Sequence, residues 1–196
     1  MRRTRSRIKA FTLIELMIVV ALIAIIVTLA APSFRDMILM QRLRGINAQL
    51  VTDLAFARSE AVSRGTFMQV SFESNSTMTC YIIFARTTAS TASMCDCRAA
   101  AGSRCSAPTL TTEVKTVQAP LSESVRFVAT SSPPYFTIDP RTGGLWVSSI
   151  PEDADGMTFK VETLIDSARS FRNQYKLSGQ LSVCTPSGST VGGTAC

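Results

Sequence analysis

The sequence contains no histidine, and it lacks the short motifs by which many hydrolases and nucleotide-binding enzymes are recognised. There is no Gly-x-Ser-x-Gly elbow, no phosphate-binding loop and no pair of carboxylates at metal-ligand spacing. Catalysis needs a base, a nucleophile or a metal held in a pocket. The sequence therefore predicts a protein that is not an enzyme and that has neither a cofactor nor a metal site.

Acidic residues are absent from the first ten positions, whereas five of the chain's 20 basic residues lie there: Arg2, Arg3, Arg5, Arg7 and Lys9. Beyond this leader, 15 basic side chains stand against 14 acidic ones, so the formal charge of +6 mainly reports the leader. Net charge therefore says nothing about the partners of the rest of the chain.

A long apolar segment follows the basic leader of residues 1–10, which is expected to stay in the cytoplasm. Phe11 to Ala31 is 21 residues, roughly 32 Å as a helix, which matches a hydrocarbon core of about 30 Å. We expect residues 11–32 to span a membrane once. Glu15 is the exception in this segment, because an unpaired charge in a bilayer is costly and usually marks a functional site.

Two simpler interpretations of the segment remain open. One is a secretory signal cut near Thr28–Ala30, although the apolar run is longer than is usual for such signals. The other is a plain membrane anchor, which leaves Glu15 unexplained.

Residues 33–65 are predicted to continue the helix in amphipathic form, with a bend at Pro32. One apolar stripe is formed by Leu43, Ile46, Leu50, Leu54, Ala57 and Ala61. Polar residues are expected mostly on the other sides: Arg42, Arg44, Gln49, Asp53, Arg58 and Arg64. Gly65 then offers a left-handed cap that ends the helix.

Residues 66–196 are predicted to form an antiparallel β domain, because the apolar period changes from about 3.6 to 2. Alternation from Met68 to Phe72 indicates a half-buried strand. Further strands are expected at 80–84, 110–117, 124–129, 135–138, 145–149, 157–164, 173–177 and 181–184. Residues 139–144 have the composition of a hairpin turn. Asp153 and Asp155 suggest either a calcium loop or an ordinary acidic turn between strands.

Six cysteines, all beyond the apolar segment, favour disulfides in an oxidising compartment: Cys80, Cys95, Cys97, Cys105, Cys184 and Cys196. Zinc binding is the alternative, but no paired Cys-x-x-Cys is present. Locality favours a Cys184–Cys196 bond that ties down the Gly/Ser/Thr-rich tail, 185–196. The other four are expected to pair among themselves and to staple the loop at 87–109, without a Cys95–Cys97 bond.

The segment Arg7–Leu16, with the apolar run that ends at Pro32, resembles the class III signal of type IV pilins and pseudopilins. Leu54–Gly65 resembles the end of the long helix in the subgroup of H-type pseudopilins and FimT/FimU-like minor pilins. Asp139–Gly143 and Gly179–Cys184 are weaker similarities.

This resemblance implies an α+β type IV pilin fold, in which a long N-terminal helix packs on an antiparallel sheet. It also implies cleavage by a prepilin peptidase between Ala10 and Phe11, followed by methylation of the Phe11 amine. Alanine stands at position 10, where the family has glycine. The new amine would lie one helical turn from Glu15, and that cation, or the amine of a neighbouring subunit, would compensate the buried carboxylate.

The implied function is that of a minor pilin that primes a type IV pilus or joins its tip, and the closest alternative is a type II secretion pseudopilin. The implied partners are major and minor pilins, the peptidase and the inner-membrane assembly platform. The chain would be a single-pass inner-membrane protein with a periplasmic C-terminal domain before it enters the pilus or pseudopilus.

DNA binding during natural uptake is a further alternative. Residues 179–182 match the position of a Gly-Arg-x-Arg segment in FimT-like proteins, but both arginines are absent here. Basic residues nearby could contact phosphates instead: Lys160, Arg169, Arg172 and Lys176. Scattered surface charge is the simpler interpretation.

Overall fold

The computed structural model describes residues 12–88, 94–146 and 158–196, without the side chains of residues 29–33. It divides the chain into two compact units, Met1–Ile38 and Leu39–Cys196. Helix α1 runs from Leu13 to Arg64 and so contributes residues to both. Pro32 lies within α1. Whether the helix bends there stays a prediction.

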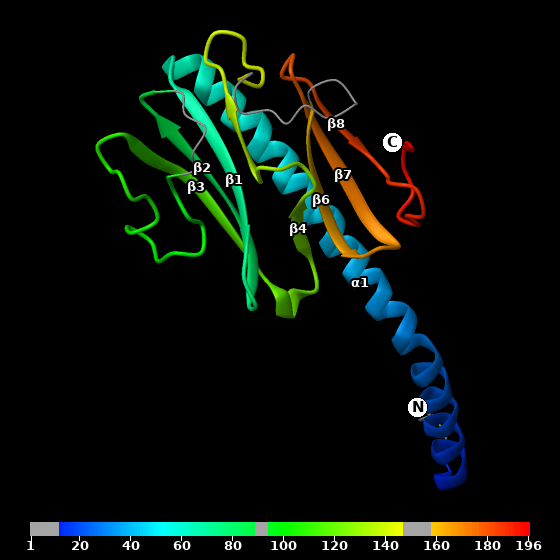
Figure 1. The fold of residues 1–196 in the computed structure, drawn as a ribbon. Coiled ribbons are helices and arrows are strands. Elements are labelled where there is room, and N and C mark those ends of the chain that lie inside the picture. The colour runs from blue at the N-terminus through cyan, green and yellow to red at the C-terminus, as the bar shows by residue number, and fades with distance from the viewer. Residues whose placement is uncertain (1–11, 89–93, 147–157) are drawn as a thin grey trace, which may run out of the picture. The chain divides into compact units, whose positions relative to one another are not determined.

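The second unit contains two four-stranded antiparallel sheets (Figure 1). The first sheet has the order β3-β2-β1-β5, with strands β1 (Phe67–Ser74), β2 (Met78–Arg86), β3 (Thr111–Pro120) and β5 (Tyr135–Ile138). The second has the order β4-β6-β7-β8, with strands β4 (Arg126–Ala129), β6 (Thr158–Asp166), β7 (Arg169–Lys176) and β8 (Leu181–Cys184). A short 3-10 helix, η1 (Leu121–Glu123), connects β3 to β4. The expected α+β class is confirmed.

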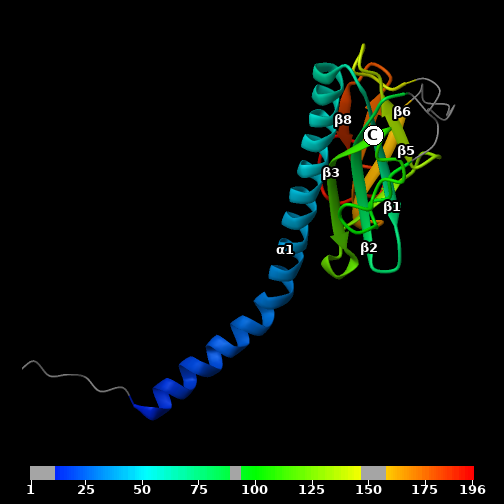
Figure 2. The same cartoon turned by 90° about the vertical axis from the view of Figure 1, so that its left-hand side faces the viewer.

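The C-terminal half of α1 covers one face of this unit (Figure 2). Of the predicted stripe, Ile46 is only partly buried. The other five residues are fully buried: Leu43, Leu50, Leu54, Ala57 and Ala61. Four of them share one core with residues of both sheets, among them Tyr81 of β2 and Phe159 of β6. The helix thus holds the two sheets together through a single apolar core.

Aromatic rings fill the centre of this core. Phe136 lies 4.6 Å from Phe159 and 5.0 Å from Tyr175, measured between ring centroids.

Gly65, with φ at +61°, ends α1 in the left-handed conformation that the sequence predicts.

The prediction of a half-buried first strand is wrong. Gln69 and Ser71 are completely buried, although they lie on the face of β1 opposite to α1. They pair across the ladder with Phe84 and Ile82 of β2, and these two side chains form a second small core with Cys95 and Cys97. The loop after β2 therefore supplies a second cover that periodicity alone did not reveal.

The predicted solvent position of Asp53 is also wrong. Its side chain is buried and accepts a hydrogen bond of 2.7 Å from the Tyr81 hydroxyl, while Lys115 Nζ lies 2.6 Å from its other oxygen. Asp53 is three residues after Leu50 and four before Ala57, so its spacing already placed it on the buried face. A buried carboxylate is tolerated here because both oxygens have partners.

Strand ends agree well for β5 and β8, whose bounds match the predicted ranges. β7 begins earlier than expected, at Arg169, because a tight turn after Asp166 returns the chain directly along β6. Of the run predicted at 145–149, Leu145 makes a single bridge with Ile138, and residues 147–149 lie outside the described ranges.

Candidate functional site

Helix α1 begins beside the predicted processing site. The hydroxyl of Thr12 accepts a hydrogen bond from the Glu15 backbone nitrogen at 3.3 Å, and the Thr12 carbonyl accepts one from Leu16. Thr12 is therefore the N-cap of the helix, and Glu15 sits in the first turn, where the helix dipole favours a negative charge. Ala10 and Phe11 lie outside the described residues.

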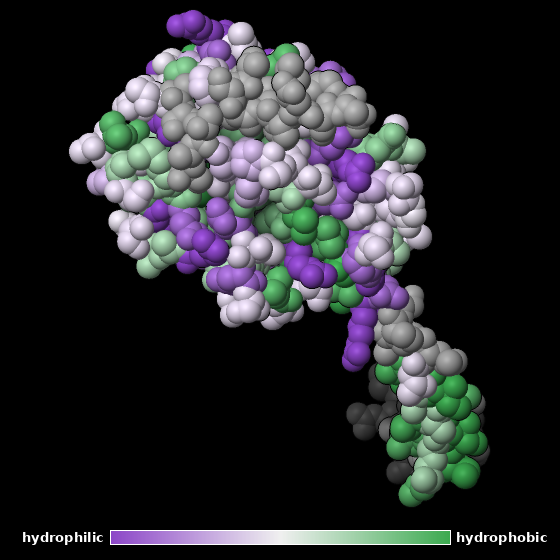
Figure 3. All heavy atoms as spheres, in the orientation of Figure 1, coloured by the Kyte–Doolittle hydropathy of each residue, from purple (hydrophilic) through white to green (hydrophobic). Residues whose placement is uncertain are grey.

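The first turns of α1 expose an almost continuous apolar surface within the first unit (Figure 3). Large side chains from Leu13 to Val27 are between 47% and 77% exposed. Glu15 is the one charged residue between Leu13 and Thr28. An apolar surface of this extent marks a contact with other chains or with lipid.

Within the residues described, no helix combines the length and the hydropathy required to cross a membrane.

In the second unit, three segments that carry the family resemblance meet at one junction. Arg58 of α1 donates a 2.9 Å hydrogen bond to the Gly179 carbonyl, and the Tyr175 hydroxyl donates one of 2.9 Å to the Gly143 carbonyl. A Cβ atom on Gly144 would lie 1.9 Å from the Leu177 carbonyl oxygen. Glycine is thus needed where the 139–144 turn meets the turn after β7.

The cysteines pair as Cys80–Cys97, Cys95–Cys105 and Cys184–Cys196. The first bond fixes the loop after β2 to that strand, and the second closes the loop on itself. Cys184–Cys196 is the bond that locality favours. All six cysteines of the sequence are thus paired, which leaves no thiolate for the zinc alternative.

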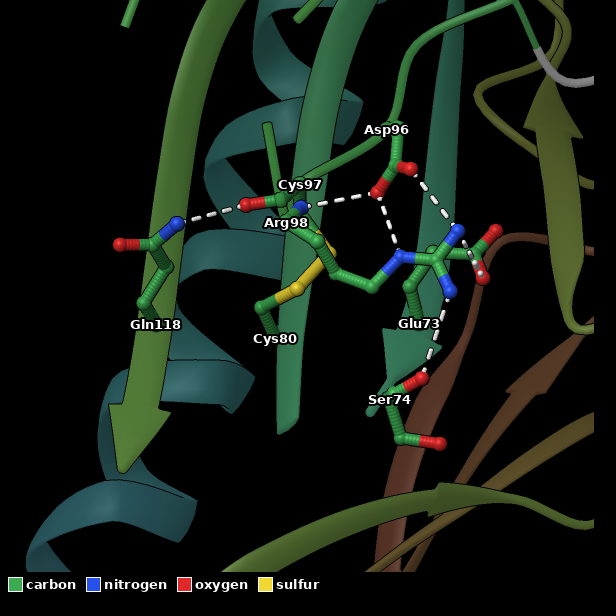
Figure 4. Close-up of polar contacts among 7 residues, drawn as sticks. All are labelled: Glu73, Ser74, Cys80, Asp96, Cys97, Arg98 and Gln118. Carbon is green, nitrogen blue, oxygen red and sulfur yellow. Dashed lines mark hydrogen bonds and ion pairs between the residues drawn. A yellow bond between two sulfur atoms is a disulfide. The ribbon is translucent and has the colours of Figure 1, made fainter. Parts of the chain in front are cut away.

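Polar contacts add to the attachment of the loop (Figure 4). Arg98 makes a bidentate pair with Asp96, with both N···O distances 2.8 Å, and its guanidinium reaches the Ser74 carbonyl at 3.4 Å. Gln118 of β3 donates a 2.7 Å hydrogen bond to the Cys97 carbonyl. The loop is therefore joined to three neighbouring strands, β1, β2 and β3.

Charges in this cluster influence one another. The hydrogen bonds from Arg98 lower the pKa of the Asp96 carboxyl. Partial burial raises the pKa of Glu73, although Arg98, 3.8 Å away, acts in the opposite direction.

The tail beyond β8 is also held in place. Thr190 donates to the Ala168 carbonyl at 2.7 Å, and Val191 is buried in an apolar cluster with Leu43 and Ile165. Arg44 of α1 reaches the Val191 carbonyl at 3.5 Å. The tail therefore joins the β6–β7 turn to the helix.

The four basic residues proposed to contact DNA lie on β6 and β7. Two are paired with carboxylates: Arg172 with Glu162 at 2.7 Å and Arg169 with Asp166 at 2.6 Å. The register places Lys160 opposite Gln174, and Lys176 opposite Thr158. The carboxylates reduce the positive potential of this surface, and DNA contact stays a prediction.

Among the residues that the structure describes, no three acidic or cysteine side chains form a cluster suited to a metal. Asp153 and Asp155, the residues of the calcium alternative, lie outside the described ranges.

Sequence reasoning missed Asn47, whose side chain accepts a 2.8 Å hydrogen bond from Asn173 of β7. It lies four residues after Leu43 and three before Leu50, and this spacing was the available signal.

Comparison with known families gives two matches. A family model described as Type II transport protein GspH matches residues 47–182, and a model described as the prokaryotic N-terminal methylation motif matches residues 5–31. No curated protein and no solved structure matches the chain significantly. The GspH match covers more than half of the chain and includes α1 from Asn47 onward, the junction of turns and the first two residues of β8. The chain therefore belongs to the GspH family of type IV pilin-like proteins.

Proposed function

We propose that this chain is a minor pilin, a structural subunit that primes a type IV pilus or joins its tip. The exposed apolar surface of Leu13–Val27, with its single carboxylate, carries the proposal. Such a surface is unfavourable in water and suits insertion in the inner membrane, followed by packing among the helices of other pilins.

Maturation in this proposal follows from the methylation motif. Prepilin peptidase cuts between Ala10 and Phe11, and this cleavage removes the five leader charges. The same enzyme then methylates the new amine. Thr12 then caps the helix as the second residue of the mature chain, so the amine and Glu15 share the first turn. Pro32 belongs to the same assembly segment. The domain from Leu39 onward lies on the periplasmic side, which three disulfides support.

A type II secretion pseudopilin is the second candidate, and it is favoured by the match to a family described as Type II transport protein GspH. A domain stapled by three disulfides resists unfolding outside the cell, which favours the pilus. Co-purification with pilins of one system or the other separates the two candidates.

Replacement of Glu15 by Gln in the full chain tests the assembly role. The amide preserves size but removes the charge, so we expect loss of surface filaments and of co-purifying pilins. Thr28→Val is the matched control, because it changes a polar group of the same exposed segment without a change in charge. Normal assembly of the Glu15→Gln chain would refute the role of this carboxylate.

A further inference from the structure

The turn between β1 and β2 contains an acceptor sequence for a covalent sugar. Of the three asparagines in the chain, Asn47, Asn75 and Asn173, only Asn75 is followed by a Ser or Thr two positions later. Asn-x-Ser/Thr with no central proline is the acceptor of N-linked glycans, which occur on exposed turns of exported proteins. We propose that Asn75 is an N-glycosylation site.

The turn presents the acceptor to solvent. Residues 74–77 are all exposed. The side-chain oxygen of Asn75 accepts three hydrogen bonds, each of 2.9 Å, from Thr77 N, Thr77 Oγ1 and Met78 N. Its side-chain nitrogen Nδ2, which would become the linkage atom, makes no hydrogen bond to any part of the chain that the structure describes.

The three contacts to the amide oxygen also bear on reactivity. Hydrogen bonds to the carbonyl oxygen of an amide draw electron density away from its nitrogen and make the N–H groups easier to deprotonate. The Thr77 hydroxyl is one of these donors, which gives the threonine of the motif a physical part in the site.

The surroundings of Asn75 leave room for a sugar. Asn75 borders an open groove of about 380 Å³ between the β1–β2 turn and β4, which Leu121, Arg126 and Val128 also line. The strand before the acceptor is held by Arg98, which contacts Ser74 and Glu73 (Figure 4). A glycan on Asn75 would project from a fixed strand end beside this groove.

The donor would be a sugar activated through its anomeric carbon as a phosphate or diphosphate ester. The new bond joins Asn75 Nδ2 to that carbon, the carbon–oxygen bond to phosphate breaks, and the phosphate leaves with the electron pair. One Nδ2 proton passes to a base of the transferase. The inference rests on the proposed periplasmic position of the domain, since the transferase must meet the turn in that compartment.

Mass spectrometry of the full chain, purified from the envelope of its source organism and digested without reduction, tests the proposal. We expect the peptide that contains Asn75 to carry a sugar mass localised on that residue. The same digest reports the three disulfides. A bare Asn75 in a chain with intact disulfides overturns the glycosylation site and leaves export in place.

Three variants produced in the same organism sharpen the test. Asn75→Asp keeps the oxygen that accepts the turn hydrogen bonds but removes Nδ2, so the sugar mass is lost while the fold is retained. Thr77→Val also loses it, whereas Thr77→Ser keeps both the hydroxyl and the sugar. A sugar that persists on the Asn75→Asp chain would mean attachment elsewhere and would overturn the proposal.

Discussion

At the scale of single residues, the glycines at the junction of turns control how closely two loops approach. Position 144 must be glycine, because the Leu177 carbonyl oxygen occupies the space that a Cβ atom would fill. Gly45, in the exposed part of α1, has no neighbour within 4 Å of the place where a Cβ atom would lie, and neither residue has a positive φ. An alanine at either position would therefore cause no strain from a left-handed backbone, and the two sites differ in whether a Cβ atom has room.

We predict opposite effects of alanine at these two positions. Gly144→Ala forces backbone atoms apart and should lower the free energy of unfolding by about 2–4 kcal/mol. Gly45→Ala should raise it by about 1 kcal/mol, because alanine is the better helix former. Urea denaturation monitored by circular dichroism measures both, and a Gly144→Ala chain as stable as the wild type would contradict the packing argument.

Tyr175 gives a prediction about alkaline pH. Burial raises the pKa of this phenol to about 12, with Arg58 acting in the opposite direction, against about 10 in an unfolded chain. The folded state holds the proton more tightly, so its contribution to stability is complete below about pH 10 and is lost as the pH rises toward about 12.

The Tyr175→Phe chain should therefore lose stability less steeply over that interval. It should also be less stable at neutral pH by about 1 kcal/mol, because the hydrogen bond to Gly143 is gone. Some decline remains, since burial also raises the pKa of Tyr81. Tyr135→Phe, at a half-buried phenol, is the control, and a Tyr175→Phe profile parallel to the wild type would disprove the assignment.

At the scale of elements, the loop after β2 acts as a lid on the outer face of the first sheet. The alternating residues of β1 predict that one face of the first sheet is exposed to solvent. That face is buried instead, because the disulfide-stapled loop packs on Ile82 and Phe84. Composition indicated a stapled loop. It could not indicate the surface on which the loop lies, because that depends on contacts between distant residues.

Removal of single disulfides tests this cover. The bonds Cys80–Cys97 and Cys184–Cys196 span 17 and 12 positions, so loop-closure entropy separates them by only about 0.3 kcal/mol. Cys80 and Cys97 are fully buried, and their replacement by Ala should cost at least about 1 kcal/mol more than the same change at Cys184 and Cys196. Equal losses in chemical denaturation would show that the cover contributes little.

At the scale of the whole molecule, the two units differ in how they are stabilised. The domain from Leu39 onward has its own core and its own disulfides, whereas the apolar side chains of Leu13–Val27 are exposed. The domain should therefore fold without the first unit, and the first unit should depend on lipid or on other subunits.

A chain that begins at Leu39 should keep the thermal midpoint of the domain within a few degrees. A chain that begins at Leu50 lacks Leu43, Ile46 and Asn47, whose contacts join α1 to the tail and to β7. Its midpoint should be roughly 5–15 °C lower, since the loss of one buried leucine costs about 2–5 kcal/mol. Calorimetry of the two chains decides whether Leu39 is the true start of the independent unit.

The sequence by itself determined the elements whose signals are local. The long helix, its buried stripe, the cap at Gly65, the ranges of β5 and β8 and the Cys184–Cys196 bond all follow from periodicity, turn chemistry and proximity along the chain. The apolar segment with Glu15 likewise indicated the family before any fold was known.

Only the tertiary structure decided which surfaces meet. It gave Asp53 the partners Tyr81 and Lys115, paired Cys80 with Cys97 and Cys95 with Cys105, and brought Arg58 to Gly179 across 121 positions of the chain. It also set carboxylates against Arg169 and Arg172, two residues that the sequence offered as phosphate contacts. These outcomes depend on packing and electrostatics between residues of different elements, and local periodicity contains no information about such pairs.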